Sequence, residues 1–217
     1  MIHNGEIGGK GTNVTENYQI RLDRELSGIK TSGRIPRLLL HSCCGPCSSY
    51  VLDYLTRYFD ITVDYYNPNI YPAEEFDRRF SEQARLLREM PLARPVELRR
   101  GDYEPDVFTA AVRGLEDEPE GGARCDVCYR LRLEHAARLA QADGFDYFTT
   151  TLSVSPYKHA NRLNTIGGEL AAQYGVSYLY SDFKKRDGYK RSCELAARYD
   201  LYRQDYCGCE YSLRART

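Results

Sequence analysis

The feature that most constrains the fold of this chain is a repeated alternation of short apolar runs with longer amphipathic segments. Leu38-Leu39-Leu40 is the clearest short run and lies in a predicted strand from Arg37 to His41. Strands that alternate with helices in this way form parallel sheets through crossover connections. We therefore predict an α/β fold with a Rossmann-like (HUP-like), doubly wound, mostly parallel five-stranded sheet and helices on both faces.

The other elements follow from the same patterns. Four further strands are predicted at Ile61 to Tyr66, Pro95 to Leu98, Asp146 to Thr151 and Val176 to Tyr180. The helices are predicted at Asn17 to Leu26, Ser48 to Tyr58, Ala73 to Glu89, Asp102 to Val112, Val127 to Ala142, Lys158 to Tyr174 and Ser192 to Tyr202.

The composition indicates one domain in a reducing compartment. Residues 1–35 are expected to be a partly disordered extension with a short helix, and residues 36–217 a single α/β domain. Residues 1–15 lack the apolar segment of a signal peptide, and no apolar run has membrane-spanning length. We expect a cytoplasmic protein without membrane contact.

Eight cysteines in 217 residues are the main chemical signal. In a reducing compartment, clustered cysteines indicate metal binding or redox catalysis more often than structural disulfides. Cys43 and Cys44 follow the first strand directly, where α/β folds place their chemistry. Cys125 and Cys128 have a two-residue gap that turns both thiolates toward one centre. These four residues are candidate ligands of a single metal centre.

Two kinds of centre compete for these cysteines. A structural zinc ion also uses two pairs of cysteines, and a zinc-binding interaction module is therefore one hypothesis. Adjacent cysteines fit poorly around one small ion, but on a tight loop their sulfurs reach different irons of a cuboidal cluster. The pattern therefore favours an iron-sulfur cluster over zinc.

Cys44-Gly45-Pro46-Cys47 raises another alternative, because it reproduces the thioredoxin active-site tetrapeptide. A thioredoxin-like thiol-disulfide oxidoreductase would use Cys44 and Cys47 as its dithiol. Against this, the chain is about twice as long as a thioredoxin domain. Cys47 could instead be a neighbour of the centre, a ligand to a further metal ion or a buried small residue.

The last three cysteines differ from one another. Cys193 lies in a helical pattern and is most simply a packed core thiol. A disulfide between Cys207 and Cys209 would close a small, strained ring, which suits reversible electron transfer. The alternative is that both are free thiols near the end of the chain.

Four ordered motifs resemble the cobalamin-independent epoxyqueuosine reductase family, QueH. The resemblance covers about residues 37 to 211. The motifs are His41-Ser42-Cys43-Cys44-Gly45-Pro46-Cys47-Ser48, Cys125-Asp126-Val127-Cys128-Tyr129-Arg130, Thr151-Leu152-Ser153-Val154-Ser155-Pro156-Tyr157-Lys158 and Tyr206-Cys207-Gly208-Cys209.

The resemblance implies an oxidoreductase that reduces epoxyqueuosine to queuosine at the wobble position of tRNA. It also implies a [4Fe-4S] cluster and a redox-active disulfide between Cys207 and Cys209. Some relatives have an aspartate where this chain has Cys47, and there a second metal ion, iron or zinc, has been proposed beside the cluster. Cys47 is thus a candidate neighbour of a second metal. The implied cluster ligands are Cys43, Cys44, Cys125 and Cys128.

The implied reaction places further demands on the chain. Removing an epoxide oxygen as water needs two electrons and a proton donor, for which Tyr129, Tyr157, His41 and Asp126 are candidates. The electron donor is external to the chain. A net charge of -1 implies that tRNA is held by a local basic rim in a salt-dependent way. Candidate basic segments are Lys184-Lys185-Arg186 with Lys190-Arg191, and Arg94 with Arg99-Arg100.

Overall fold

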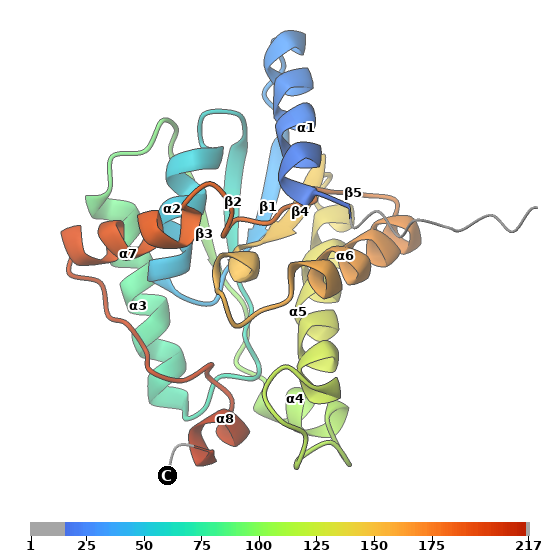
Figure 1. Cartoon of the computed structure of the whole chain (residues 1–217), viewed down its shortest axis with the longest axis vertical. Coiled ribbons are helices and arrows are strands. Elements are labelled where there is room, and N and C mark those ends of the chain that lie inside the picture. Colours follow the sequence, from blue (N-terminus) through green and yellow to red (C-terminus); the bar gives the residue numbers. More distant parts are fainter. Residues whose placement is uncertain (1–15, 216–217) are drawn as a thin grey trace, which may run out of the picture.

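The computed structural model describes residues 16–215 and contains a parallel five-stranded sheet (Figure 1). The strands lie in the order β3-β2-β1-β4-β5, and every neighbouring pair is parallel. This confirms the predicted doubly wound α/β fold. The strands are β1 (Arg37–His41), β2 (Asp60–Tyr65), β3 (Val96–Arg100), β4 (Tyr147–Thr150) and β5 (Ser177–Tyr178).

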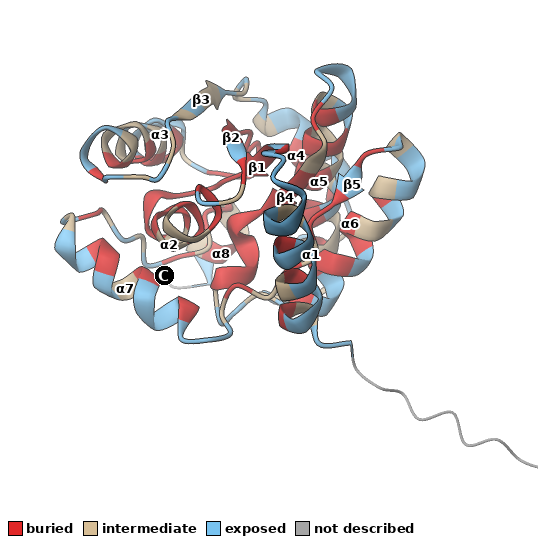
Figure 2. Cartoon of the chain, turned by 90° about the horizontal axis from the view of Figure 1, so that it is seen from above, coloured by how far each residue is buried: buried red, intermediate tan, exposed pale blue. Residues whose placement is uncertain are grey.

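Helices cover both faces of the sheet. Figures 1 and 2 show α2 (Gly45–Leu55), α3 (Ala73–Glu89) and α7 (Gly188–Arg198) on one side. On the other side lie α5 (Ala123–Ala142) and α6 (Ala160–Tyr174). The remaining elements are α1 (Tyr18–Ser32), α4 (Pro105–Ala111), the 3-10 turn η1 (Thr151–Val154) and α8 (Glu210–Arg214).

The central strand β1 divides the core into two layers because successive side chains point to opposite faces of a strand. Leu38 and Leu40 pack with α1 and α2, whereas Leu39 packs with α5 and α6. All three leucines are fully buried. The continuous apolar run is thus explained by a strand that is covered on both sides.

Helix α1 is longer than the predicted segment and belongs to the core. Asn17 caps its first turn by accepting hydrogen bonds from the backbone of Gln19 and Ile20. Leu22 and Leu26 are buried in the same cluster as Leu38. The disorder predicted for residues 1–15 lies outside the described residues.

Several boundaries differ from the prediction. Helix α2 begins at Gly45 instead of Ser48, because proline is tolerated in a first helical turn and Pro46 stands there. Helix α5 begins at Ala123, which places both of its cysteines inside the helix. Helix α7 spans Gly188–Arg198 in place of Ser192 to Tyr202, and α8 was not predicted. Among the described residues, no helix has the length and apolar character needed to cross a bilayer.

Candidate redox-active thiol site

The first cysteine pair lies where β1 passes into α2. Cys44 is the N-cap residue of α2, and the Sγ atoms of Cys43 and Cys44 are 3.9 Å apart. Both side chains are buried. The connection is held in place because the Ser42 backbone donates a hydrogen bond to the carbonyl of Asp64 on the neighbouring strand. The pair therefore stands at the carboxyl edge of the sheet, as predicted.

The second pair projects from the first two turns of α5. Cys125, Cys128 and Arg132 follow each other at intervals of three and four residues, which places them on one face of the helix. Cys128 is buried, whereas Cys125 is half-buried and its Sγ accepts a hydrogen bond from the Gly121 backbone at 3.2 Å. A helix amino terminus favours anions, so this position suits thiolates.

The segment with Cys207 and Cys209 folds back against the sheet edge. The Gly208 carbonyl accepts a hydrogen bond from the Tyr71 backbone at 2.8 Å. The Cys207 carbonyl accepts one from Nη1 of the buried Arg79 at 3.2 Å. Gly208 has φ +127°, a conformation that side chains rarely allow, and a Cβ there would lie 2.9 Å from Arg79. The turn between the two cysteines therefore requires glycine.

Two of these segments line one cavity of about 260 Å³, and the segment with Cys125 and Cys128 packs against both of them. Cys43, Cys44, Cys47 and Cys207 line this cavity directly. Cys209 packs against Cys128 in one buried cluster, and Cys125 packs against the cluster that contains Cys43 and Cys44. The fold thus gathers seven of the eight cysteines, all as free thiols.

Burial dominates the electrostatics of the thiols. It raises the pKa of Cys128 to about 12 and also raises the pKa of Cys125. The hydrogen bond with Cys44, together with burial, raises the pKa of Cys43. Cys43 lowers the pKa of Cys44, but Cys47 and burial outweigh it and raise that pKa to about 11. The site therefore needs cations or a metal to hold these groups as thiolates.

Two cations supply part of that charge. Arg132 is buried beside Cys128, whose carbonyl accepts a hydrogen bond from its Nε at 3.1 Å. Lys158 lines the cavity and interacts with Cys207 and Cys43. Burial opposes the charge of both side chains, yet the sulfurs raise the pKa of each. Neither forms an ion pair with a carboxylate in residues 16–215, which is costly for a buried guanidinium.

This environment fits an anionic, thiolate-bound centre. Arg79, a third cation, is paired with Glu75 but keeps a buried Nη2 without a hydrogen-bond partner, and it interacts with Cys44 and Cys43. In the described part of the chain, no three His, Cys, Asp or Glu side chains are placed to hold one metal ion. Cluster ligands bind different irons and do not have to converge on one ion.

The other predicted site residues are placed as follows. Cys47 lies in the first turn of α2 beside Cys44, but Cys44 is too buried to act as an exposed nucleophile. Cys193 on α7 is half-buried beside Arg203, which lines the cavity. Cys193 therefore contacts a charged residue of the cavity lining, which a thiol packed in the core would not do.

Of the four candidate proton donors, two tyrosines lie at or near the thiols, whereas the histidine and the aspartate are less suitably placed. Tyr157 lines the thiol cavity, and Tyr129 is buried near Lys158 and Cys125. His41 is fully buried, and burial lowers its pKa to about 3, so it is uncharged near neutral pH. Asp126 points away from the thiols.

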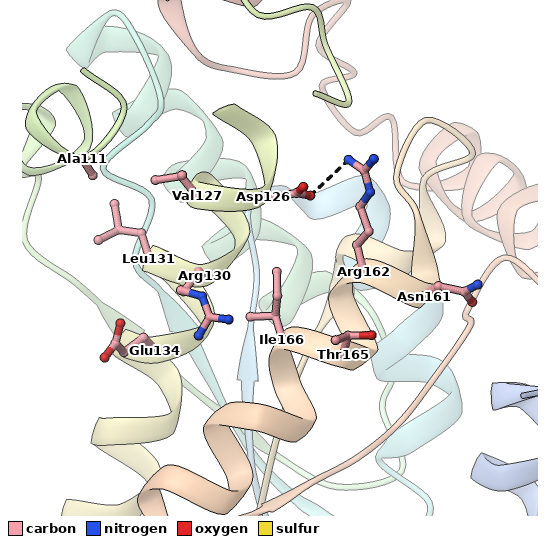
Figure 3. A pocket seen from close by; sticks show the side chains of 10 residues that line it. All are labelled: Ala111, Asp126, Val127, Arg130, Leu131, Glu134, Asn161, Arg162, Thr165 and Ile166. Atoms are coloured by element: carbon pink, nitrogen blue, oxygen red, sulfur yellow. Dashed lines mark hydrogen bonds and ion pairs between the residues drawn. The ribbon is translucent and has the colours of Figure 1, made fainter. Parts of the chain in front are cut away.

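The carboxylate of Asp126 belongs to a different cavity, an apolar groove of about 560 Å³ beside α5 and α6 (Figure 3). There it forms an ion pair with Arg162 at 3.2 Å. No cysteine lines this groove. Its walls are Ala111, Asp126, Val127, Arg130, Leu131, Glu134, Asn161, Arg162, Thr165 and Ile166.

The sequence analysis missed the cations of the site. Arg132 follows Cys128 by four residues, so helical spacing alone would have placed it on the cysteine face. Lys158 stands in one of the motifs, but only the folded chain brings it to the cysteines. The predicted basic segment around Arg94 does not form a free patch, because Arg99 pairs with Asp143 and Arg100 with Asp77.

Comparison with known proteins gives a family match over most of the chain. The family model described as epoxyqueuosine reductase QueH matches residues 38–215. A protein of that name from Streptococcus pyogenes serotype M1 is 43% identical over 93% of this chain and 82% of the relative. The relative from Staphylococcus epidermidis is 41% identical, covering 98% and 91%, and the one from Thermotoga maritima is 33% identical, covering 82% and 91%.

Proposed function

The chain belongs to the epoxyqueuosine reductase QueH family of oxidoreductases, and from this we propose that it reduces epoxyqueuosine to queuosine at the wobble position of tRNA. The reaction removes an epoxide oxygen as water and leaves a carbon-carbon double bond. It consumes two electrons and two protons. An external reductant restores the enzyme after each cycle.

The proposed cofactor is a [4Fe-4S] cluster held by Cys43, Cys44, Cys125 and Cys128. When bound, it supplies electrons one at a time and a Lewis-acidic iron. Arg132 and Lys158 support this assignment, because each is a cation without a carboxylate partner beside these sulfurs. Cys47, which lines the cavity beside Cys44, is the proposed neighbour of a second metal ion.

Cys207 and Cys209 form the proposed two-electron store. Oxidation of two thiols to one disulfide releases two electrons and two protons, which balances the deoxygenation of the epoxide and the formation of one water. Cys207 lines the cavity, so its sulfur is accessible to a ligand there. The glycine between the cysteines allows the tight turn that a disulfide across one residue needs.

Lys158 is the proposed residue that stabilises charge on the substrate. Lys158 is the cation that lines the cavity beside both Cys43 and Cys207. A retained positive charge there stabilises negative charge that develops on the epoxide oxygen as it leaves carbon. Cys43 and Cys44 are buried at the cavity, which limits the access of water to their sulfurs.

The observation that supports this proposal best is that three separate cysteine motifs pack together and two of them line one cavity. The alternative dithiol, Cys44 and Cys47, explains neither the second pair nor Cys207. Burial of Cys44 also counts against it, because thiol-disulfide exchange needs an accessible nucleophile.

The test is to purify the protein without oxygen and then assay it on tRNA that carries epoxyqueuosine. About four irons and four sulfides per chain, together with queuosine formation, are expected. A colourless protein that holds zinc would refute the cofactor assignment. An iron-containing protein that leaves the epoxide intact would refute the activity.

A further inference from the structure

The exposed tyrosines of the molecule are concentrated around the thiol cavity. The chain has 19 tyrosines, all within the described residues, and only Tyr71, Tyr157 and Tyr189 are exposed. Tyr157 and Tyr189 line the cavity itself. Tyr71 lies next to it, because its backbone bonds Gly208 in the cysteine turn. Aromatic exposure is thus a property of this site and not of the surface in general.

Both cavity tyrosines stand on short, fixed pieces of backbone. Tyr157 follows Pro156 in a turn in which Ser155 accepts hydrogen bonds from the backbones of Tyr157 and Lys158. Its ring, 76% exposed, makes no ring or cation contact in residues 16–215. Tyr189 begins α7 beside Gly188, where a Cβ would lie 1.9 Å from the Phe183 carbonyl oxygen. The Tyr157 ring is therefore left uncovered, whereas the Tyr189 side chain is partly exposed and interacts with Arg203.

The size of the cavity decides what can enter it. About 260 Å³ is slightly below the range of about 300 to 1,000 Å³ that is usual for small-molecule pockets. Only part of one modified nucleoside, such as its epoxide-bearing arm, fits inside, and a stretch of RNA does not. The nucleotides on either side of the modified one must remain at the mouth, where Tyr157 and Tyr189 lie.

The charges of the cavity do not favour phosphate. Its lining contains Lys158 and Arg203 but also Glu120 and Asp205, so the formal charges cancel. Phosphate attraction therefore cannot supply most of the affinity at this wall. Stacking of bases on aromatic rings needs no net charge and tolerates any sequence.

We propose that Tyr157 and Tyr189 are stacking platforms for the two unpaired bases that flank the modified nucleotide of an RNA loop. The inference rests on the proposed function and deepens it. The platforms hold the neighbouring bases at the mouth, while the epoxide-bearing arm of the modified nucleoside extends inward to Cys207. The ligand recognised is thus a single-stranded RNA segment and not the free nucleoside.

The experiment measures RNA binding by the cluster-containing enzyme without oxygen. A fluorescent anticodon stem-loop that carries epoxyqueuosine is titrated with native protein and with Tyr157→Ala, Tyr189→Ala, Tyr157→Phe and Tyr189→Phe. Each alanine variant should weaken binding by about 5-fold to 150-fold, the equivalent of one stacked base. The phenylalanine variants should bind like the native protein, because the ring is kept.

A matched control is Tyr174→Ala. Tyr174 is half-buried at the far end of α6, where its hydroxyl donates to Glu134 at 2.8 Å, and its loss should leave binding unchanged. A base analogue that loses fluorescence on stacking, placed next to the modified nucleotide, gives an independent signal. Its quenching should disappear in at least one of the two alanine variants.

The outcomes separate this inference from the proposed function. If the native enzyme reduces the RNA but both alanine variants bind within twofold of it, the stacking platforms are refuted and the function stands. Phenylalanine variants as weak as the alanine variants would refute stacking in favour of the hydroxyl groups. Equal turnover of the free nucleoside would refute the RNA contact. A native protein that neither binds nor reduces the RNA would refute both proposals.

Discussion

The two cavities of this protein differ most in how well their polar groups are satisfied. In the apolar groove, Asp126 pairs with Arg162, Arg130 pairs with Glu169, and Glu134 accepts a hydrogen bond from Tyr174. The thiol cavity is smaller, and its Gln204 keeps a buried Oε1 without a partner. The charged side chains named in the groove thus all have partners, whereas the thiol cavity keeps a buried polar atom without one.

This difference indicates which cavity was built for chemistry. Native proteins pair nearly all of their buried polar groups, so unpaired groups at one place point to a missing ligand. Thr151, Asn67 and Asn69 also keep unpaired buried oxygens where β4 and β2 end, near the cysteines. The larger cavity is the weaker candidate for catalysis, because size alone supplies no reactive group.

The largest effect should come from removing one proposed cluster ligand. In Cys128→Ala, iron content and turnover are both expected to fall to background, because a cluster held by three thiolates is incomplete. The matched control is Thr165→Ala in the groove, which should keep full iron content and turnover. Iron analysis and absorption spectra check this. A Cys128→Ala protein with a full cluster would contradict the ligand assignment.

Replacing Cys207 should separate the electron store from the cluster. Cys207→Ser is expected to keep its iron and its RNA affinity but to lose at least about 100-fold in turnover, because a serine cannot form the disulfide. The same loss is expected for Cys209→Ser. Mass mapping of non-reduced peptides after turnover should show the Cys207–Cys209 disulfide in the native enzyme. Full activity of either variant would remove the proposed store.

Arg132→Met tests whether the thiol site is built for an anion. Without a cluster, the buried guanidinium has no carboxylate partner, so the methionine variant should match or exceed the native stability, by up to about 4 kcal/mol. With the cluster, the same change should weaken cluster retention. Denaturant unfolding of the native protein and the variant, each with and without the cluster, checks the sign of the change in stability. Destabilisation of the cluster-free protein by several kcal/mol would contradict this account.

Asp64 gives a smaller, pH-dependent effect. Burial raises its pKa to about 7, although Arg99 lowers it, and its Oδ2 has no hydrogen-bond partner. Because the folded pKa exceeds the unfolded value, this group stabilises the protein fully below about pH 4. The stabilisation is lost as the pH rises toward 7.

Asp64→Asn should therefore gain stability relative to the native protein between pH 4 and 7, by about 2 to 4 kcal/mol in all. His41 and His135 have lowered pKa values and shift stability in the opposite direction. Because His135 Nε2 lies 3.8 Å from Asp64 Oδ1, the comparison is repeated in a His135→Gln background, where the same trend is expected. Urea unfolding of the two proteins across this pH range checks the trend. A difference that does not change with pH would show that Asp64 titrates normally.

Much of this arrangement could be predicted from the sequence. The strand Arg37–His41 and the helix Ala73–Glu89 have the predicted boundaries, because their apolar periodicity is strong and turn residues bound them. The first cysteine pair was placed correctly at the carboxyl edge of the sheet. The local sequence pattern was sufficient to predict those elements whose structure depends mainly on residues of the same segment.

Other features depend on contacts between distant segments. The start of α7 was misplaced because Gly188, which looks like a loop residue, begins the helix by packing against Phe183. The cation of Lys158 reaches the cysteines only through tertiary folding. The cancelling charges of the thiol cavity could not be predicted from the sequence either. The four charged residues come from three separate segments of the chain, namely Lys158, Arg203 with Asp205, and Glu120.

The smallest effect is expected at a series of contacts that joins the groove to Cys125. Arg162 pairs with Asp126 in the groove and also donates to the Gly121 carbonyl, while the Gly121 backbone donates to the Sγ of Cys125. Because the Arg162 side chain is partly exposed, Arg162→Gln should cost only about 0.2 to 1 kcal/mol and change turnover less than about twofold. A tenfold loss of turnover, or a shifted cluster potential in redox titration, would instead show that the groove tunes Cys125 through Gly121.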